Sequence, residues 1–339
     1  MAVTVSSQAL IQIDDRSQVG EGRRAAAHLT RALGFDATAA GNVALAVTEA
    51  ATNIVKHAGR GKLVLRCLER GGIGGLEILA LDQGPGITNM GASLRDGHST
   101  SGSMGTGLGA LSRISHSMDI YTQPAKGTAV RLEFWAAPLL KPARTPQIGA
   151  VCLPKTGEVA CGDAWAVARD GVDWSLLVVD GLGHGTDAAR AARTATEVLG
   201  KHPAVAPGEL LRLMHLAMAS TRGGAAAVAR FGTLQAQGVF AGVGNIGART
   251  ESLASRRQLV SHNGTLGHSL RKVQEFSFDF APDAALILHS DGLAGHWALA
   301  DYPGLMAKHP GLIAGVLYRD HDRGRDDVTV VVIKRGMGT

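Results

Sequence analysis

Apolar runs of strand length and segments with helical spacing alternate through the first part of the chain. A helix is predicted around Glu21–Leu33, and a second between Asp36, a good N-cap residue, and Gly59 just past its end. The stretch 91–109 is rich in glycine, serine and threonine, which predicts a loop leading into a helix at Leu108–Met118. The strand-like runs are Ala9–Ile13, Leu63–Leu68, Leu76–Leu81 and Ala129–Trp135.

The pattern changes at a proline-containing segment. Pro138, Pro142 and Pro146 lie where neither helical nor strand periodicity is present, which predicts a linker. Beyond it the chain is richer in strand-like runs, with helices predicted at Thr186–Leu199 and Pro207–Ser220. The predicted strands there are Glu158–Val167, Trp174–Val179, Ala225–Gln235, Gly238–Val243 and Leu286–His289.

Length and composition support a chain of two globular domains. At 339 residues the chain exceeds what one hydrophobic core usually supports. We therefore expect domains at 1–137 and 148–339, joined by a linker at 138–147. Hydrophobic residues make up 45% and charged residues 19%, so disorder is not expected.

Charge and cysteine content narrow the possible functions. The net charge of +5 is spread over both halves, so a nucleic-acid-binding face is not predicted. Cys67, Cys152 and Cys161 have no CxxC spacing, which argues against a disulfide framework or a zinc site and favours free thiols. The N-terminus does not resemble a signal peptide, and no apolar run approaches the ~20 residues of a membrane span. The expected location is the cytoplasm, without a membrane partner.

Three polar residues recur at four-residue intervals in the second helix. Glu49, Asn53 and His57 share one face, because each step of four turns the side chain by only ~40°. An Asn oxygen is a natural Mg²⁺ ligand, and a nearby Glu can take a proton from an attacking hydroxyl. By itself this pattern is equally typical of a solvent-exposed helix face. His57 is interpreted as a helix C-terminal cation in preference to a Mg²⁺-side residue.

Two glycine-containing segments follow in the same half. Asp82 ends an apolar strand, where it can accept a hydrogen bond from an exocyclic amine, and Gly84 and Gly86 let the backbone approach a flat ligand. The alternative is a simple strand-ending turn. Gly105, Gly107 and Gly109 open a helix, whose free N–H groups and dipole favour phosphate. Together and in this order, the segments predict a nucleotide site.

The second half carries acids at the ends of apolar runs. Asp180 ends WSLLVVD, Asp291 ends ALILHSD, and Asp326 and Asp327 precede VTVVVIK, while Asp163 begins a predicted strand. Several uncompensated acids at neighbouring strand ends require cations, and oxygen ligands suit Mg²⁺ or Mn²⁺. Each Asp can alternatively cap a turn. Their combination favours a two-metal site that activates water for attack on a phosphate.

The first half resembles the Bergerat-fold ATPases, and within them the RsbT-like serine/threonine switch kinases of bacterial partner-switching systems. VTEAATNIVKHAGRGKLVL, ILALDQGPGI and DGHSTSGSMGTGLGALSRI carry the resemblance, which covers residues 5–136. It implies an α/β sandwich in which Glu49 is the catalytic base, Asn53 binds Mg²⁺ and Asp82 contacts adenine. Further nucleotide-binding positions would be Gly84, Gly86, Gly105, Gly107, Leu108, Gly109 and Thr128.

The second half resembles the PPM-type serine/threonine phosphatases of the SpoIIE and RsbX branch. VVDGLGHGTDAARAA, STRGGAAAVARF, GVFAGVGNIGAR, LHSDGL and RDDVTVVVIK carry the resemblance over residues 148–335. It implies a β-sandwich flanked by helices and two Mg²⁺ or Mn²⁺ ions. The implied ligands are Asp180, the carbonyl of Gly181, Asp291 and Asp326, with Asp163 in a supporting role. In the eukaryotic relatives a His directly follows the metal-binding Asp-Gly, whereas here Leu182 intervenes. Two roles stay open for His184: a general acid, and at least equally a packing or hydrogen-bonding residue.

Together the two resemblances imply an α+β protein of two domains that combines kinase and phosphatase activities. The expected partners are STAS-domain proteins, either anti-sigma-factor antagonists or stressosome scaffold proteins, which one domain would phosphorylate with ATP and the other dephosphorylate. An alternative keeps the phosphatase active and makes the ATP module a partner-binding device without turnover. A degenerate, purely regulatory role for one module is a third possibility.

Overall fold

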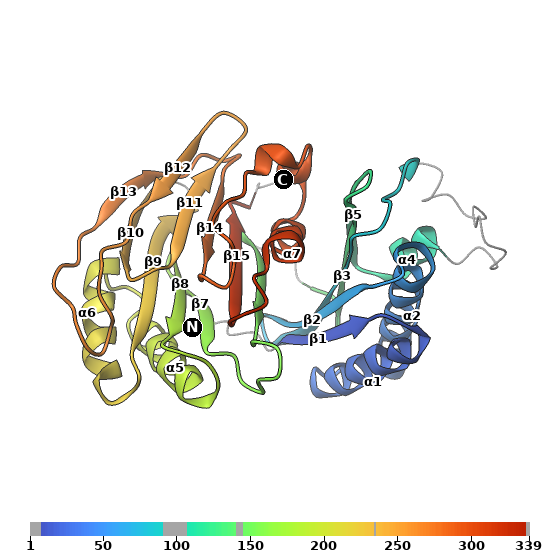
Figure 1. The fold of residues 1–339 in the computed structure, drawn as a ribbon, viewed down its shortest axis with the longest axis horizontal. Coiled ribbons are helices and arrows are strands. Elements are labelled where there is room, and N and C mark those ends of the chain that lie inside the picture. Colours follow the sequence, from blue (N-terminus) through green and yellow to red (C-terminus); the bar gives the residue numbers. More distant parts are fainter. Residues whose placement is uncertain (1–7, 91–106, 140–144, 234, 337–339) are drawn as a thin grey trace. The chain divides into compact units, whose positions relative to one another are not determined.

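The computed structural model describes residues 8–90, 107–139, 145–233 and 235–336. The chain divides into two compact units (Figure 1). The N-terminal unit contains Ser6–Pro142 and also Ala307–Arg319, whereas the C-terminal unit contains Ala143–Met306 and Asp320–Thr339. A short segment late in the sequence therefore belongs to the N-terminal unit, which the sequence pattern does not anticipate.

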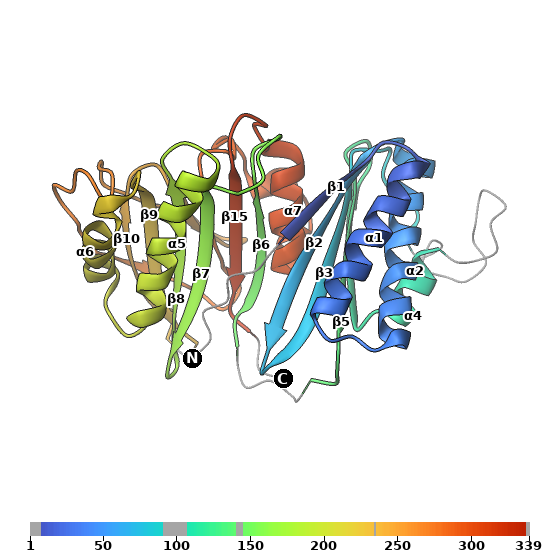
Figure 2. The same cartoon turned by 90° about the horizontal axis from the view of Figure 1, so that it is seen from below.

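The N-terminal unit is built on one antiparallel sheet of five strands in the order β1-β2-β3-β5-β4. Helices α1 (Arg16–Ala32) and α2 (Ala37–Asn53) lie side by side across one face of this sheet (Figures 1 and 2). The strands are β1 (Gln8–Ile13), β2 (Gly61–Arg70), β3 (Ile73–Asp82), β4 (Ser117–Gln123) and β5 (Gly127–Trp135).

Capping residues define the ends of both helices. The Asp15 side chain accepts a hydrogen bond from Ser17 N, and Gln18 completes a capping box, so α1 begins five residues before the predicted start. Asp36 caps α2 as predicted, accepting a hydrogen bond from Ala39 N at 2.7 Å. The helix continues as one π-helical segment, η1 (Ile54–Ala58), and ends at Gly59 with a φ of 77°.

Strand β3 is buried on both faces. Leu76, Ile78 and Ala80 pack in the core beneath the helices. Leu79 and Leu81 point the other way, because side chains alternate along a strand, and lie close to Gly315 of α7 (Pro310–His321). The missing side chain at Gly315 lets the helix backbone approach this face closely.

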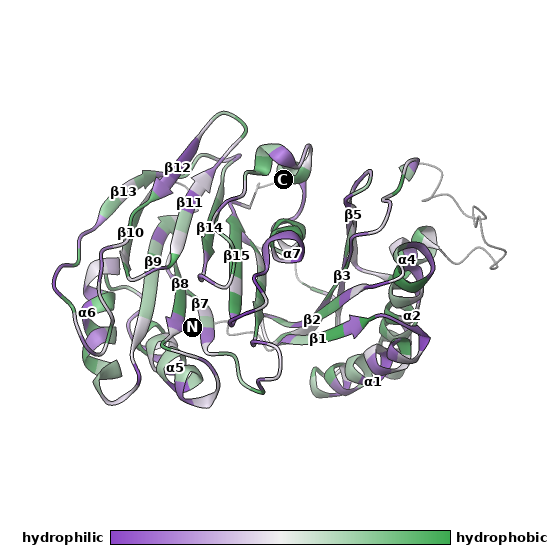
Figure 3. Ribbon diagram, viewed as in Figure 1, coloured by the Kyte–Doolittle hydropathy of each residue, from purple (hydrophilic) through white to green (hydrophobic). Residues whose placement is uncertain are grey.

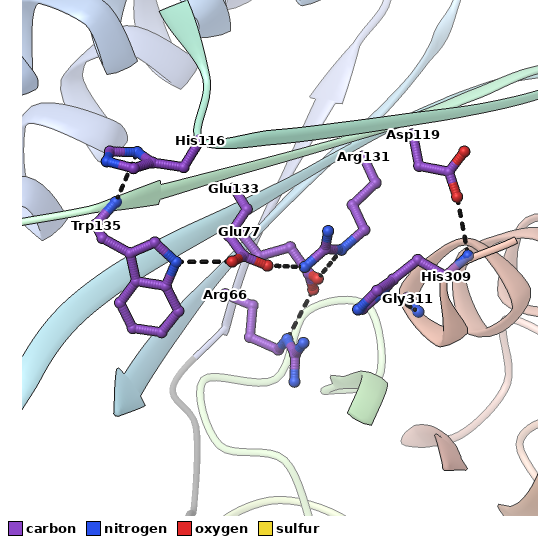
Figure 4. Close-up of polar contacts among 9 residues, drawn as sticks. All are labelled: Arg66, Glu77, His116, Asp119, Arg131, Glu133, Trp135, His309 and Gly311. Atoms are coloured by element: carbon purple, nitrogen blue, oxygen red, sulfur yellow. Dashed lines mark hydrogen bonds and ion pairs between the residues drawn. The ribbon is translucent and has the colours of Figure 1, made fainter. Parts of the chain in front are cut away.

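A buried ionic network lies on the α7 side of the sheet (Figure 4). The Glu77 carboxylate accepts hydrogen bonds from Arg66 Nε at 2.8 Å and from Arg131 Nε at 2.5 Å. Arg131 also pairs with Glu133, which accepts a hydrogen bond from Trp135 Nε1 at 2.7 Å. Glu77 is completely buried. A charged residue is tolerated there because two guanidinium groups compensate it.

The C-terminal unit contains two antiparallel five-stranded sheets, ordered β13-β10-β9-β8-β7 and β12-β11-β14-β15-β6. Apolar residues from both sheets form one core, including Trp165, Phe231 and Phe240. The strands are β6 (Gln147–Leu153), β7 (Asp163–Asp170), β8 (Asp173–Gly181), β9 (Gly224–Gly232), β10 (Gln237–Val243), β11 (Gly247–Glu251), β12 (Arg256–Leu259), β13 (Phe276–Asp279), β14 (Ala285–His289) and β15 (Val328–Lys334).

Helices α5 (Thr186–Lys201) and α6 (Pro207–Ala217) cover the outer face of the first of these sheets. Their apolar sides, rich in alanine and leucine, pack on residues such as Leu177 and Val228. Strands β14 and β15 are hydrophobic along almost their whole length (Figure 3), in keeping with their burial. The result is the expected β-sandwich flanked by helices.

Several predicted elements differ from those observed. The helix predicted at Leu108–Met118 ends earlier, as α4 (Leu108–Ile114), because the following residues pair as β4. The strand predicted at Glu158–Val167 begins only at Asp163. Strands β6, β11, β12 and β13 and helix α7 have no counterpart among the predicted elements. Within the described residues no helix is long and apolar enough to cross a membrane.

Candidate nucleotide and metal sites

The end of β3 presents Asp82 in a backbone frame. Its Oδ1 accepts hydrogen bonds from Gly84 N at 2.9 Å and from Thr128 N at 3.1 Å. The Thr128 hydroxyl lies 3.2 Å from that of Thr122, which accepts a hydrogen bond from Ile87 N at 2.8 Å. These hydrogen bonds hold the ends of β3, β4 and β5 around the Asp82 carboxylate. That carboxylate can still accept a hydrogen bond from a flat heterocycle with an amino group.

Close backbone contacts explain the glycines of this loop. A Cβ on Gly84 would lie 2.7 Å from the Ala58 Cβ, and one on Gly86, whose φ is 78°, would lie 2.6 Å from the Gln123 carbonyl oxygen. No other residue fits either position without movement. The contact between Gly84 and Ala58 also brings the end of the second helix against the Asp82 loop.

Glu49 and Asn53 lie one turn apart near the end of α2, and both are partly exposed. They can therefore reach a ligand in solution while the opposite side of α2 stays in the core. The π-helical segment begins directly after Asn53, so regular α-helical spacing does not extend to His57. His57 is exposed, and its charge lowers the pKa of Asp82, which places it near the Asp82 loop.

The predicted phosphate loop is described only at its end. Gly107 precedes α4, and Leu108 and Gly109 form its first turn. A helix start with free N–H groups therefore lies where the sequence predicts it. Gly105 lies outside the described residues.

Asp82 is influenced by the segment that joins this unit from late in the sequence. Burial raises the pKa of Asp82, and the opposing influences are the hydrogen bonds from Gly84 and Thr128 and the charges of Arg319 and His57. Arg319 Nη1 also donates to the Asp82 carbonyl oxygen at 3.0 Å. The sequence pattern does not reveal Arg319, because 237 positions separate it from its partner.

The second site begins where β7 and β8 meet. Asp163 and Asp180 are directly opposite each other in the antiparallel register. Asp180 is followed by Gly181, whose N–H donates to the Gly162 carbonyl oxygen at 3.0 Å. A Cβ on Gly181 would lie 2.3 Å from the Ala188 carbonyl oxygen, so the start of α5 packs directly against the end of β8.

The other sheet contributes Asp291, Asp326 and Asp327. Ser290 Oγ accepts a hydrogen bond from Thr329 N at 2.9 Å, which holds the two strand ends together. Asn245 Nδ2 donates to Asp291 Oδ2 at 2.7 Å. The two oxygens of Asp327 accept hydrogen bonds from Lys155 N and Gly162 N, at 2.8 and 2.9 Å. Both carboxylate oxygens of Asp327 are therefore used in hydrogen bonds to the backbone.

These acids interact electrostatically across the sandwich. Burial, followed by the charges of Asp163, Asp291, Asp326 and Asp327, raises the pKa of Asp180 to about 8. Burial also raises the pKa of Asp163 well above its ordinary value. Asp163 Oδ2 is buried and has no hydrogen-bond partner among the described residues. Carboxylates that raise each other's pKa in this way favour positive charge in their midst.

The donor set fits hard divalent cations. Its members are carboxylates and backbone carbonyls, the ligands of Mg²⁺ and Mn²⁺. In the part of the chain that the structure describes, no three His, Cys, Asp or Glu side chains form a ready-made metal cluster. The spacing of these acids fits an ion that is held by one or two carboxylates and keeps part of its water shell.

Two histidines of the region have structural partners. His184 Nδ1 lies 2.6 Å from Glu158 Oε1, in keeping with a hydrogen-bonding role, one of the two that the sequence leaves open. His262 stacks on Phe276 of β13. The contribution of Asn245 to the acidic site was not predicted, although the residue lies in the GVGNIGAR segment that supported the resemblance.

Comparison with known proteins agrees with this division. Residues 13–134 match the family of the histidine kinase-like ATPase domain. The serine/threonine-protein kinase RsbT of Bacillus subtilis (strain 168) is 29% identical over 131 residues, which are 39% of this chain and 98% of RsbT.

Solved structures resemble a longer part of the chain. One, from work on the bacterial stressosome as a modular system adapted to control secondary messenger signalling, has 29% identity and a TM-score of 0.52, covering 56% of this chain and 100% of that chain. RsbX in complex with magnesium has 19% identity and a TM-score of 0.51, covering 58% and 98%. The RsbX structure covers 58% of this chain, a larger fraction than residues 1–137 make up. The RsbX-like fold therefore includes the C-terminal unit.

The chain joins an RsbT-like ATPase domain to a PPM-type phosphatase fold. The first domain is of the kind found in a serine/threonine kinase, and the second has the fold of RsbX. Both predicted resemblances, and the predicted α+β fold of two domains, are confirmed. Use of ATP by the first domain and of divalent metal ions by the second agrees with these relatives.

Proposed function

We propose that this protein is a bifunctional regulator of a bacterial partner-switching or stressosome pathway. Its N-terminal domain would phosphorylate Ser or Thr residues of STAS-domain proteins with ATP, and its C-terminal domain would hydrolyse phospho-Ser or phospho-Thr. The proposal is supported by an RsbT-like ATPase domain and an RsbX-like fold in one chain. The homologue RsbT is a serine/threonine kinase, and a structural relative comes from work on the stressosome.

In the N-terminal domain, Asp82 and Thr128 would hold the adenine, with Gly84 and Gly86 forming the adjoining wall. Asn53 would bind Mg²⁺, which would neutralise charge on the phosphates of ATP. Glu49, one helical turn away, would accept the proton of the attacking hydroxyl. The start of α4, with Gly105, Gly107, Leu108 and Gly109, would bind the phosphates.

In the C-terminal domain, Asp180, Asp291, Asp326 and the Gly181 carbonyl would hold two Mg²⁺ or Mn²⁺ ions, which would supply an activated water. Asp163 would support this site, since its Oδ2 has no hydrogen-bond partner among the described residues. Asp327 is not assigned as a ligand, because both its oxygens already accept backbone hydrogen bonds. Asn245 would orient Asp291 through its 2.7 Å hydrogen bond.

One observation carries the phosphatase proposal. Burial, followed by the charges of four further aspartates, raises the pKa of Asp180 to about 8. A fold that gathers negative charge without compensation is built to receive cations. Such an arrangement costs stability unless ions bind.

The phosphatase proposal is tested with a phosphorylated STAS-domain protein and Mn²⁺. Release of phosphate by the wild type should be lost in Asp180→Asn, and Asp283→Asn, an exposed acid in the same unit, should behave as the wild type. Unchanged release by Asp180→Asn would show that the metal assignment is wrong.

The kinase proposal is tested by phosphate transfer from ATP to the same STAS-domain protein in the presence of Mg²⁺. Glu49→Ala should lose transfer and retain partner binding. The competing function is an ATP-gated binding module without turnover. It predicts that the wild type binds ATP and partner but transfers no phosphate, so the same assay distinguishes the two.

A further inference from the structure

Two thiols that the sequence separates are brought together beside the acidic site. Cys152, on β6, and Cys161, just before β7, have their sulfur atoms 3.8 Å apart. Both residues are partly exposed. The Cys152 thiol also donates a hydrogen bond to the Asp163 carbonyl oxygen at 3.8 Å. The contact thus joins a strand of one sheet to the residues that lead into a strand of the other.

We propose that Cys152 and Cys161 are an oxidisable dithiol that forms a disulfide when a hydroperoxide reaches it. In the first step one thiol is oxidised to a sulfenic acid, and the peroxide O–O bond breaks to release water or an alcohol. In the second step the other sulfur attacks the sulfenic sulfur, the S–O bond breaks, and water leaves. Two thiols lose two electrons in total, and one hydroperoxide gains them.

The separation of the sulfur atoms makes this reaction accessible with a small movement. A disulfide requires about 2.05 Å between the sulfur atoms, so the pair must approach by roughly 1.8 Å. Cys161 lies in a segment between strands, whereas Cys152 pairs with Thr329 within the sheet. The movement therefore falls mainly on Cys161.

Cys161 cannot move without displacing Gly162, the next residue in the chain. A Cβ on Gly162 would lie 2.7 Å from the Ala188 Cβ and 2.7 Å from Asp327 Oδ2, so the segment has little free space. Gly162 also donates to Asp327 and accepts a hydrogen bond from Gly181 N. Displacement of Gly162 thus reaches Asp163 and Gly181. We expect the disulfide to weaken divalent-cation binding, a consequence that rests on the proposed phosphatase function.

The disulfide itself is tested on the full-length, metal-free protein treated with hydrogen peroxide. Peptide mapping without reductant should find Cys152 linked to Cys161, with the mass of two hydrogen atoms lost and restored by dithiothreitol. Cys67, in the N-terminal unit, is the internal control and should form no such link. Cys152→Ser and Cys161→Ser should each abolish the product. Absence of the linked peptide in the wild type, while Cys67 is oxidised, would overturn the proposal.

The effect on the site is measured by titration with Mn²⁺, followed through the paramagnetic resonance of the free ion. Oxidised protein should bind Mn²⁺ about 10- to 100-fold more weakly than reduced protein, the range seen when ligand-supporting contacts are lost. Peroxide-treated Cys152→Ser should keep the affinity of the reduced protein. Equal affinity of both redox forms would overturn the coupling, whereas failure of reduced protein to bind Mn²⁺ would overturn the proposed function.

Discussion

Two acids, the buried Glu77 of the N-terminal unit and the partly exposed Asp180 of the C-terminal unit, have opposite electrostatic surroundings. Burial acts to raise the pKa of Glu77, but the charges of Arg66 and Arg131 outweigh it, and the pKa falls to about 2. Burial also acts on Asp180, and the neighbouring aspartates add to it, so its pKa rises to about 8. The same functional group is thus compensated in one unit and left uncompensated in the other.

The difference separates a structural charge from a functional one. Glu77 has its compensating cations in the chain itself, so it contributes to a fixed arrangement of strands (Figure 4). After burial, the charges that act on Asp180 are those of four aspartates, so the site favours cations from solution. An acid whose pKa is raised by other acids is therefore the better indicator of a site.

Replacement of Glu77 by Gln should have the largest effect on stability. It leaves Arg66 and Arg131 buried without their counter-ion, and breaking such a pair typically costs about 3–5 kcal/mol. Urea unfolding should show this loss for the N-terminal unit. The control is Glu209→Gln, which breaks an exposed pair with Arg212 and should change stability by less than about 1 kcal/mol. Equal effects would contradict the structural role of Glu77.

Replacement of Asp180 by Asn should lower activity strongly and affect metal-free stability little. Metal-dependent hydrolysis of a small aryl phosphate should fall by about 100-fold or more, because a ligand of the activating ions is lost. Metal-free stability should stay the same or rise, because one uncompensated charge is removed. Thermal unfolding in a chelator and turnover in Mn²⁺ measure the two quantities. A large loss of metal-free stability would make Asp180 structurally equivalent to Glu77.

Asp82 represents an intermediate case, since backbone donors and two nearby cations partly compensate its burial. Asp82→Asn keeps an acceptor for Gly84 N and Thr128 N but removes the charge. ADP should bind about 10- to 100-fold more weakly, since hydrogen bonds to charged groups contribute about 1.5–3 kcal/mol. Isothermal titration calorimetry measures this, with the exposed Asp14→Asn as control. Unchanged affinity would remove Asp82 from the nucleotide site.

Arg319→Ala should have a smaller effect at the same site. It removes a hydrogen bond to the Asp82 carbonyl oxygen and a charge that lowers the pKa of Asp82. We expect ADP affinity to fall about 5-fold at pH 7. As the pH is lowered, the ADP affinity of Arg319→Ala should begin to fall at a higher pH than that of the wild type. The reason is that the Asp82 carboxylate protonates more easily without the charge of Arg319. Arg319→Lys, which keeps the charge, should retain the wild-type pH profile, and a shifted profile in that variant would contradict the electrostatic role.

Mild acid should destabilise the N-terminal unit. Burial, followed by the charge of Arg131, lowers the pKa of His309 to about 4 from 6.5, so protonation favours the unfolded chain and stability falls as pH drops from 6.5 through 4. The contribution of Glu77 is present above 4.5 and is lost as pH falls through about 2. In His309→Asn the first of these losses should disappear while the second persists. Unfolding curves between pH 7 and 3 test this, and an unaltered profile would contradict it.

The sequence by itself determined most elements and the kinds of residue at both sites. Asp36 caps α2, Gly59 ends the helix that α2 begins, and Asp82 ends β3, because capping, left-handed turns and apolar runs are local properties. The acids Asp163, Asp180, Asp291 and Asp326 likewise stand out where apolar runs begin or end. Strand β13 was missed because its partner, β10, is remote in sequence. Strand β12 was missed because it has only four residues, three of them exposed and polar, so no apolar run marks it.

Only the tertiary structure decided which side chains meet. The register of β7 with β8 sets Asp163 opposite Asp180, and two backbone N–H groups occupy Asp327 while Asp163 keeps an unpartnered oxygen. The pairing of Arg319 with Asp82, and the contact of Cys152 with Cys161, depend on chain segments that only the fold brings together. Local sequence encodes conformation and chemistry, whereas burial and electrostatic compensation depend on neighbours from distant parts of the chain.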